Sequence, residues 1–220
     1  MTGRKWDQRI ARAGELAATY PFAAQGLRFY ERIASFQKSL YESLAAGSGT
    51  GIGSKAEKRA RPPGSLRDEL ELFLLLPWFG SFLPFVEDIA PPPLAQSAAE
   101  LRNRGGMRWE EVLDEYWRAG RAGEEEGLAL AAGEALIAWA FLQPYAEHLA
   151  DHTERSEGAE RAEIRGTPPL CPLCSGRPQV GVLRPLGDGA KRSLVCSLCA
   201  TEWEYRRIVC PACGEENVDK

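Results

Sequence analysis

The sequence has few of the residues that acid–base catalysis or phosphate binding would require. Its 220 residues include two histidines, His148 and His152, and its formal net charge is −4. An acidic chain does not attract a phosphate backbone as a whole, which argues against a nucleic acid partner. Glycines are frequent in residues 46–54, but no Gly-Lys-Ser/Thr follows them as in a phosphate-binding loop. We interpret residues 46–65 as a flexible linker.

The sequence also lacks a long apolar run. The most apolar segment, residues 127–142, is shorter than the roughly 20 residues that a membrane span needs, and Glu134 interrupts it. The first nine residues are polar and lack the apolar stretch of a secretory signal. Cysteine is absent before residue 171, and the six cysteines that follow are spaced as metal ligands, a pattern typical of a reducing compartment. We therefore expect a cytoplasmic protein without membrane insertion.

The six cysteines form three Cys-x-x-Cys pairs within the last fifty residues. Two thiolates three residues apart on a tight turn can bind one metal ion, and two such turns complete a tetrahedral site. The first two pairs are 21 residues apart, the spacing of a hairpin that joins two metal-binding turns. The alternatives are disulfides or redox-active thiols. The spacing predicts one ion, either structural zinc or rubredoxin-type iron, bound by Cys171, Cys174, Cys196 and Cys199.

The third pair, Cys210 and Cys213, has no fourth pair after it in this sequence. It could be a truncated metal half-site, a half-site completed by another chain, or a redox dithiol. A redox pair usually begins a helix of a thioredoxin-like domain, for which residues 214–220 leave no room. We favour an incomplete metal half-site.

The histidines and the acidic run 124–126 offer no comparable pattern. His148 and His152 are spaced as two ligands on a helix could be, but no glutamate follows the first as in zinc proteases. We expect both to be exposed polar residues. The acidic run is interpreted as a solvated helix start, and no catalytic residue is expected.

Apolar periodicity predicts an α+β fold, in which an N-terminal helical bundle precedes a small rubredoxin-like or zinc-ribbon β module. Residues 1–150 are expected to be helical, with a break at Pro21. Prolines within residues 66–85 predict a short, broken helix, and Pro91–Pro93 a stiff spacer. After a linker at 151–168, the module at 169–220 should contain strands near 179–185, 191–195 and 202–209, with a turn at Asp188-Gly189.

With these residues in view, the chain resembles the formate dehydrogenase accessory protein (FdhE) family. The resemblance is most specific at residues 171–178 (Cys-Pro-Leu-Cys-Ser-Gly-Arg-Pro), 193–203 (Ser-Leu-Val-Cys-Ser-Leu-Cys-Ala-Thr-Glu-Trp) and 207–214 (Arg-Ile-Val-Cys-Pro-Ala-Cys-Gly). Weaker similarity lies at residues 12–17, 27–29, 37 and 142–146. The sequence differs from the family in lacking the fourth pair, and in Tyr20 before Pro21, where the family often has histidine.

The resemblance implies a non-enzymatic assembly factor for a molybdenum- or tungsten-dependent formate dehydrogenase. Such proteins resemble a helical domain followed by two rubredoxin-like modules, of which the second would be incomplete here, and they bind the catalytic subunit of the dehydrogenase. The candidate contact is formed by Thr201, Glu202, Trp203 and Arg207, although Trp203 could instead pack beneath the second Cys-x-x-Cys turn. The oligomeric state stays open.

Two other functions are compatible with a four-cysteine module. A zinc-ribbon protein that binds nucleic acid would use the arginines of the module, and its binding would be sensitive to salt. An electron-transfer protein would hold iron and show visible thiolate-to-iron absorption.

Overall fold

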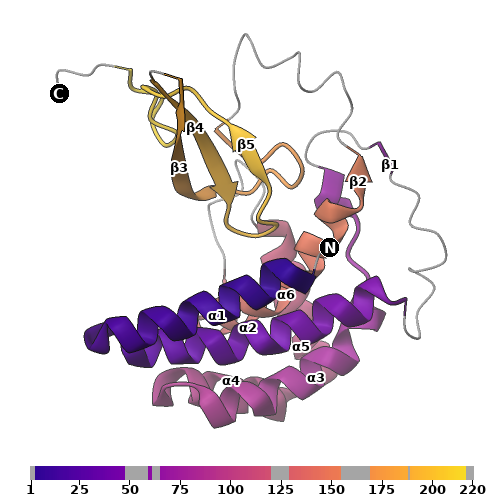
Figure 1. Cartoon of the computed structure of the whole chain (residues 1–220). Helices are drawn as coiled ribbons and strands as arrows, with labels where there is room; N and C mark the ends of the chain where they lie inside the picture. The colour runs from indigo at the N-terminus through magenta and orange to yellow at the C-terminus, as the bar shows by residue number, and fades with distance from the viewer. Residues whose placement is uncertain are drawn as a thin grey trace.

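The computed structural model describes residues 3–47, 59–60, 65–119, 129–154, 169–187 and 189–216. Helices gather in the lower half of Figure 1, and a three-stranded sheet lies above them. The expected α+β fold class is confirmed. The helical elements are α1 (Gly3–Thr19), η1 (Pro21–Ala23), α2 (Ala24–Ala45), η2 (Ser65–Asp68), α3 (Leu72–Ile89), α4 (Pro92–Arg104), α5 (Gly106–Ala119) and α6 (Ala132–Asp151). The strands are β1 (Arg59–Ala60), β2 (Thr153–Glu154), β3 (Pro178–Leu186), β4 (Gly189–Cys196) and β5 (Glu202–Glu204).

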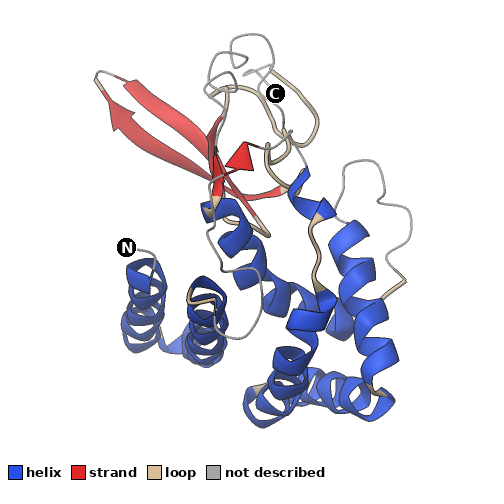
Figure 2. Ribbon diagram, turned by 90° about the vertical axis from the view of Figure 1, so that its right-hand side faces the viewer, coloured by secondary structure: helices blue, strands red, loops and turns tan. Residues whose placement is uncertain are grey.

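Helices α1 and α2 form a hairpin that breaks at Tyr20, as Pro21 predicts. Trp6 of α1 packs against Tyr41 of α2, with ring centroids 6.2 Å apart. Helix α2 also packs against α6, and Arg9 of α1 reaches Glu147 of α6 in a 2.7 Å ion pair. The hairpin therefore lies against the side of α6, as Figure 2 shows.

Helix α3 runs uninterrupted through Pro77 and Pro84, so the prediction of a short, broken helix is wrong. Each internal proline removes one backbone hydrogen bond and costs about 3 kcal/mol or more. The buried face of α3 compensates, because Leu75, Phe79, Phe82 and Leu83 are fully buried and each side chain contributes about 1.5–3 kcal/mol. Burial in the core therefore overrides the local preference of the prolines.

Helix α3 is also the one helix, within the described ranges, that is long and apolar enough to cross a membrane. Core helices pass the same test of length and composition, and a third of α3 is buried within the structure. Its buried face contacts α6, since the ring centroids of Phe82 on α3 and Phe141 on α6 are 5.5 Å apart.

The stiff spacer expected at Pro91–Pro93 is wrong as well. Pro92 and Pro93 form the first turn of α4, and Pro91 is its N-cap. A proline fits the first turn of a helix because the amide that it lacks would have no partner there. Gly105, with a φ of +77°, then ends α4 before α5 begins.

The sheet is antiparallel in the order β3-β4-β5. The hairpin closes with Leu186 opposite Gly189, and Asp188 lies outside the described residues. Strand β5 ends at Glu204, earlier than expected, and Tyr205 donates its amide to the carbonyl of Arg192. Strands β1 and β2 form a short parallel pair, Arg59 opposite Thr153, so two residues of each segment expected to be a linker are paired. The domain limits stay predictions.

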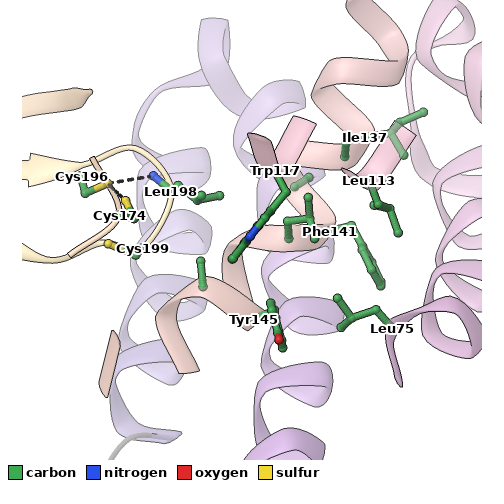
Figure 3. Packing of buried hydrophobic residues seen from close by; sticks show 14 of the residues in the cluster. Leu75, Leu113, Trp117, Ile137, Phe141, Tyr145, Cys174, Cys196, Leu198 and Cys199 are labelled. Atoms are coloured by element: carbon green, nitrogen blue, oxygen red, sulfur yellow. Dashed lines mark hydrogen bonds between the residues drawn. The ribbon is translucent and has the colours of Figure 1, made fainter. Parts of the chain in front are cut away.

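The sheet and the helices share one core. Leu198, next to the cysteines of the sheet end, belongs to the same buried apolar cluster as Trp117 of α5 and Tyr145 of α6 (Figure 3). Trp139 of α6 donates its indole N–H to the carbonyl of Ser197 at 2.9 Å. The cysteine turns are thus held directly against α5 and α6.

Candidate metal centre

The first Cys-x-x-Cys turn is held by its own backbone. The amide of Cys171 donates to the carbonyl of Gly176 at 2.8 Å, and the amide of Ser175 donates to the carbonyl of Cys171 at 2.9 Å. Ser175 has a φ of +55°, which turns the chain back directly after Cys174. This closed loop presents both sulfurs on the same side, and we call such a loop a knuckle.

The second knuckle repeats the arrangement at the end of β4. The amide of Cys196 donates to the carbonyl of Thr201 at 2.9 Å, and Ala200, directly after Cys199, has a φ of +52°. The amide of Leu198 lies 3.4 Å from the sulfur of Cys196, and the hydroxyl of Thr201 lies 3.1 Å from the sulfur of Cys199. Such contacts stabilise thiolates.

The two knuckles bring four buried sulfurs together. The sulfurs of Cys171 and Cys199 are 3.5 Å apart, those of Cys174 and Cys196 are 3.4 Å apart, and all four lie within 4.8 Å of one another. These separations are too long for a disulfide bond of about 2.05 Å. The two shortest separations lie slightly below the edge of about 3.8 Å that a tetrahedron of sulfurs has when each is about 2.3 Å from a central zinc ion. The cluster could therefore hold one metal ion, which is what the spacing of the first two pairs predicts.

The electrostatics of the cluster favour a central cation. Hydrogen bonds shared among the sulfurs raise the pKa of Cys171 and Cys199 and lower the pKa of Cys174 and Cys196, while burial opposes ionisation of all four. Without a cation, four adjacent thiolates would repel one another in a buried site. A divalent ion removes this conflict, because each thiolate then faces a positive charge at bonding distance.

The third pair forms a knuckle of the same shape. The amide of Cys210 donates to the carbonyl of Glu215, and that of Gly214 donates to the carbonyl of Cys210, both at 2.9 Å. Gly214 has a φ of +73°, directly after Cys213 as in the other two knuckles. The amides of Cys213 and Ala212 lower the pKa of the Cys210 thiol. Cys210 is half-buried and Cys213 exposed, and within the described part of the chain neither belongs to a group of three or more ligands.

The four residues expected at a partner surface do not all reach the surface. Thr201 and Trp203 are 7% and 8% exposed, and Trp203 lies opposite Leu194 in the sheet, where it belongs to the shared core. Trp203 is therefore a core residue of the sheet. Glu202 is half-buried and forms an ion pair with Arg184, and Arg207 is exposed. Only Glu202 and Arg207 remain candidates for a contact made through side chains.

The expectation of exposed histidines is wrong for His148, which is 5% exposed. Burial, followed by the nearby His152, lowers the pKa of His148 to about 4. The two rings are 4.3 Å apart, and Nδ1 of His152 lies 2.7 Å from the carbonyl of His148. No third ligand joins them among the residues that the structure describes.

Arg67 is a site residue that the sequence pattern does not reveal. It lies in η2, more than 100 residues before the first knuckle, and donates from Nε to the carbonyl of Cys174 at 2.8 Å. It also donates from Nη1 to the carbonyl of Trp117. No motif marks it, because its proximity to the cysteines arises only from the packing of the sheet on the helices.

Comparisons with known proteins agree with this architecture. The family model described as "FdhE, central domain" matches residues 170–207, which include both knuckles of the four-cysteine cluster. A crystal structure of the FdhE protein from Pseudomonas aeruginosa has the same fold, with a TM-score of 0.62 and 24% identity over 98% of this chain and 72% of that one.

Curated relatives are described as FdhE homologs. The one from Edwardsiella ictaluri is 35% identical over 53% of this chain and 40% of its own length. Those from Shewanella baltica and Glaesserella parasuis are 25% and 28% identical over 96% of this chain and 65% and 66% of their own lengths. This chain thus spans between 40% and 66% of these three relatives. The resemblance that the cysteine motifs indicate is confirmed.

Proposed function

From the relationship of this chain to the FdhE proteins, we propose that it is an accessory protein that supports the assembly of a formate dehydrogenase in the cytoplasm. It would act by binding the catalytic subunit and not by turning over formate itself. The observation that carries this proposal is the buried four-cysteine cluster, which lies within the region matched by the FdhE central domain. A cluster closed by four protein ligands suits a binding protein better than a hydrolytic enzyme, because it leaves no coordination position for a substrate.

The metal would be held by Cys171, Cys174, Cys196 and Cys199 and would be either zinc or iron. Zinc would have a structural role, whereas iron in the same cage could also exchange an electron. In both cases the ion would fix the two knuckles that carry the sheet against α5 and α6. The visible absorption of the purified protein distinguishes the two metals, because ferric thiolate sites absorb strongly and zinc sites do not.

Cys210 and Cys213 would form half of a second site. Their knuckle has the same two backbone hydrogen bonds as the first knuckle, and a left-handed residue at the same position as in both complete ones. Two further ligands would have to come from outside the described residues or from another chain. Since metal affinity depends on the number of ligands, this half-site alone would bind metal weakly.

The contact with the catalytic subunit is proposed for the surface beside the second and third knuckles. Arg207 is exposed, and its side chain has no partner among the described residues. Glu202 begins β5, the strand that precedes Arg207, and Ile208, next to Arg207, is 55% exposed. An exposed charge beside an exposed apolar residue suits an interface that is steered by charge and completed by apolar contact.

The test is binding of purified formate dehydrogenase catalytic subunit to wild-type protein and to an Arg207→Glu variant. Reversal of this charge should weaken binding, and the loss should shrink at high salt. Arg28→Glu is the matched control, because Arg28 is an exposed arginine on α2, away from the sheet. Metal content is measured for each protein so that misfolding is not mistaken for lost contact. If wild-type protein with its metal bound does not bind the catalytic subunit, the proposal is wrong.

A further inference from the structure

Arg67 is a buried cation at the junction between the helices and the knuckles. It is 5% exposed, and among the described residues no carboxylate forms an ion pair with it. Two carboxylates, Asp68 and Asp114, line the same cleft, and Asp114 pairs with Arg118 at 2.9 Å. The known partners of the guanidinium are the carbonyls of Cys174 and Trp117 and the ring of Trp117, 5.9 Å away. A buried charge is costly unless an opposite charge compensates it, and two carbonyl dipoles supply only part of that compensation.

The four cysteines supply a negative charge at close range. Gly176 lies between Arg67 and the sulfurs: a Cβ on this glycine would be 3.6 Å from Nη2 of Arg67 and 3.1 Å from the sulfurs of both Cys174 and Cys196. Four thiolates around a divalent ion carry a net charge of −2, since four negative charges meet two positive ones. Arg67 therefore faces a negatively charged centre whenever the site holds its metal.

Tyr116 of α5 lies near enough to Arg67 and to Cys196 for both to influence its pKa. Burial raises the pKa of Tyr116, Arg67 lowers it, and the Cys196 sulfur raises it again. One phenol thus senses both the guanidinium and the sulfur. The interior that separates them has a low dielectric constant, so the attraction between Arg67 and the thiolates is screened less than it would be at the surface.

We propose that Arg67 is the counter-charge of the occupied metal centre, so that metal binding and the docking of the knuckles on the helices are energetically coupled. This inference rests on the metal site proposed above. With metal bound, Arg67 stabilises the negative centre and is itself stabilised. Without metal, no ion joins the two knuckles, so the sulfurs are no longer held beside Arg67 and the contacts around it weaken. One of these is the hydrogen bond from the amide of Leu66 to the carbonyl of Leu173, 3.1 Å long.

The first test compares metal affinity, by competition with a chelator, for wild-type protein and the variants R67M, R67K and R177M. R67M keeps most of the side-chain volume but removes the charge, and it should bind metal about tenfold more weakly or worse, as is typical when a partner of the metal ligands is lost. R67K should recover most of the affinity, because it restores the charge although not the forked hydrogen bonds. R177M is the control, because Arg177 is exposed and close in sequence to Cys174.

The outcomes separate this inference from the metal site itself. If wild-type protein binds no metal, the metal-site proposal and this one both fail. If wild-type protein binds metal and R67M binds it equally well, only the role of Arg67 is refuted. If R67K binds as weakly as R67M, packing or hydrogen bonding is responsible and the role of the charge is refuted.

A second test uses wild-type protein alone, so it does not depend on the folding of a variant. Hydrogen exchange is measured with and without bound metal. Metal removal should speed exchange at the amide of Leu66, whereas amides in the middle of α3, near Phe79, should stay protected. Unchanged protection at Leu66 in the metal-free protein would refute the coupling.

Discussion

Replacement of Cys174 by serine removes a thiolate from the centre of the four-cysteine cluster. Cys174 is fully buried, and its sulfur lies 3.4 Å from that of Cys196. Structural zinc contributes about 10–16 kcal/mol in small metal-dependent modules, so one of four ligands accounts for about 2.5–4 kcal/mol. The variant should therefore bind metal roughly 60- to 700-fold more weakly.

Loss of the metal should destabilise the knuckles and the sheet first, and the helices least. The sheet has little core of its own, and Leu198 shares one buried apolar cluster with Trp117 and Tyr145 of the helices. We expect limited proteolysis to cut the Cys174→Ser protein after Pro169 first. The helical signal in circular dichroism should change little, because Phe79 and Phe141 pack against each other between the helices themselves, with ring centroids 4.8 Å apart.

Metal content by mass spectrometry and the rate of proteolysis are measured together. Cys213→Ser is the matched control, because it removes an exposed thiol from a knuckle of the same shape outside the cluster. This control should retain the metal of the first site and its resistance to proteolysis. Full metal occupancy in Cys174→Ser would show that this cysteine is not a ligand.

Two further predictions concern the third knuckle and the buried histidine. In native protein, a thiol reagent should modify Cys210 and Cys213 well before the four buried cysteines, because these two are the less buried of the six. The order of modification is measured by mass spectrometry. Equal protection of all six thiols would mean that unidentified ligands saturate the third pair. His148 has a pKa of about 4 in the folded protein, below its ordinary value of 6.5, so the stability that it contributes is present above pH 6.5 and is lost as the pH falls towards 4. This loss amounts to about 3 kcal/mol. The free energy of unfolding, measured in urea, should therefore fall more steeply between pH 6.5 and pH 4 in wild-type protein than in His148→Leu. Parallel pH profiles of the two proteins would show that the pKa of His148 is not lowered.

The metal ligands could be predicted from the sequence because a knuckle is a local structure. Two cysteines three residues apart, followed by a residue that adopts a left-handed conformation, determine where both sulfurs point. Ser175, Ala200 and Gly214 occupy this last position, and only the glycine signals it in the sequence. The hairpin between the first two knuckles then follows from their spacing and from its turn residues.

Features that depend on tertiary packing were not predictable in the same way. The prolines of α3 favour a break locally, and only the apolar surface that α3 buries shows why the helix continues. His148 looks polar in the sequence, yet the packing of α2 on α6 buries it. Arg67 lies far from the cysteines along the chain, so no spacing rule connects it to them.

The residues expected to contact a partner could not be assigned from the sequence alone either. Thr201, Glu202, Trp203 and Arg207 are close in sequence and share a distinctive motif, but a motif does not distinguish residues that form the core from those that meet a partner. The alternation of a strand points successive side chains to opposite faces. Thr201 and Trp203 accordingly face the core, while Glu202 and Glu204 face outward and pair with Arg184 and Lys191.

The central claim is that this protein supports the assembly of a formate dehydrogenase, and deletion of its gene tests this most directly. Formate dehydrogenase activity and the amount of mature catalytic subunit are measured in extracts of the host with and without the gene. The account predicts that both fall in the deletion strain and that a plasmid carrying the wild-type gene restores them. Unchanged activity and unchanged maturation in the deletion strain would contradict it.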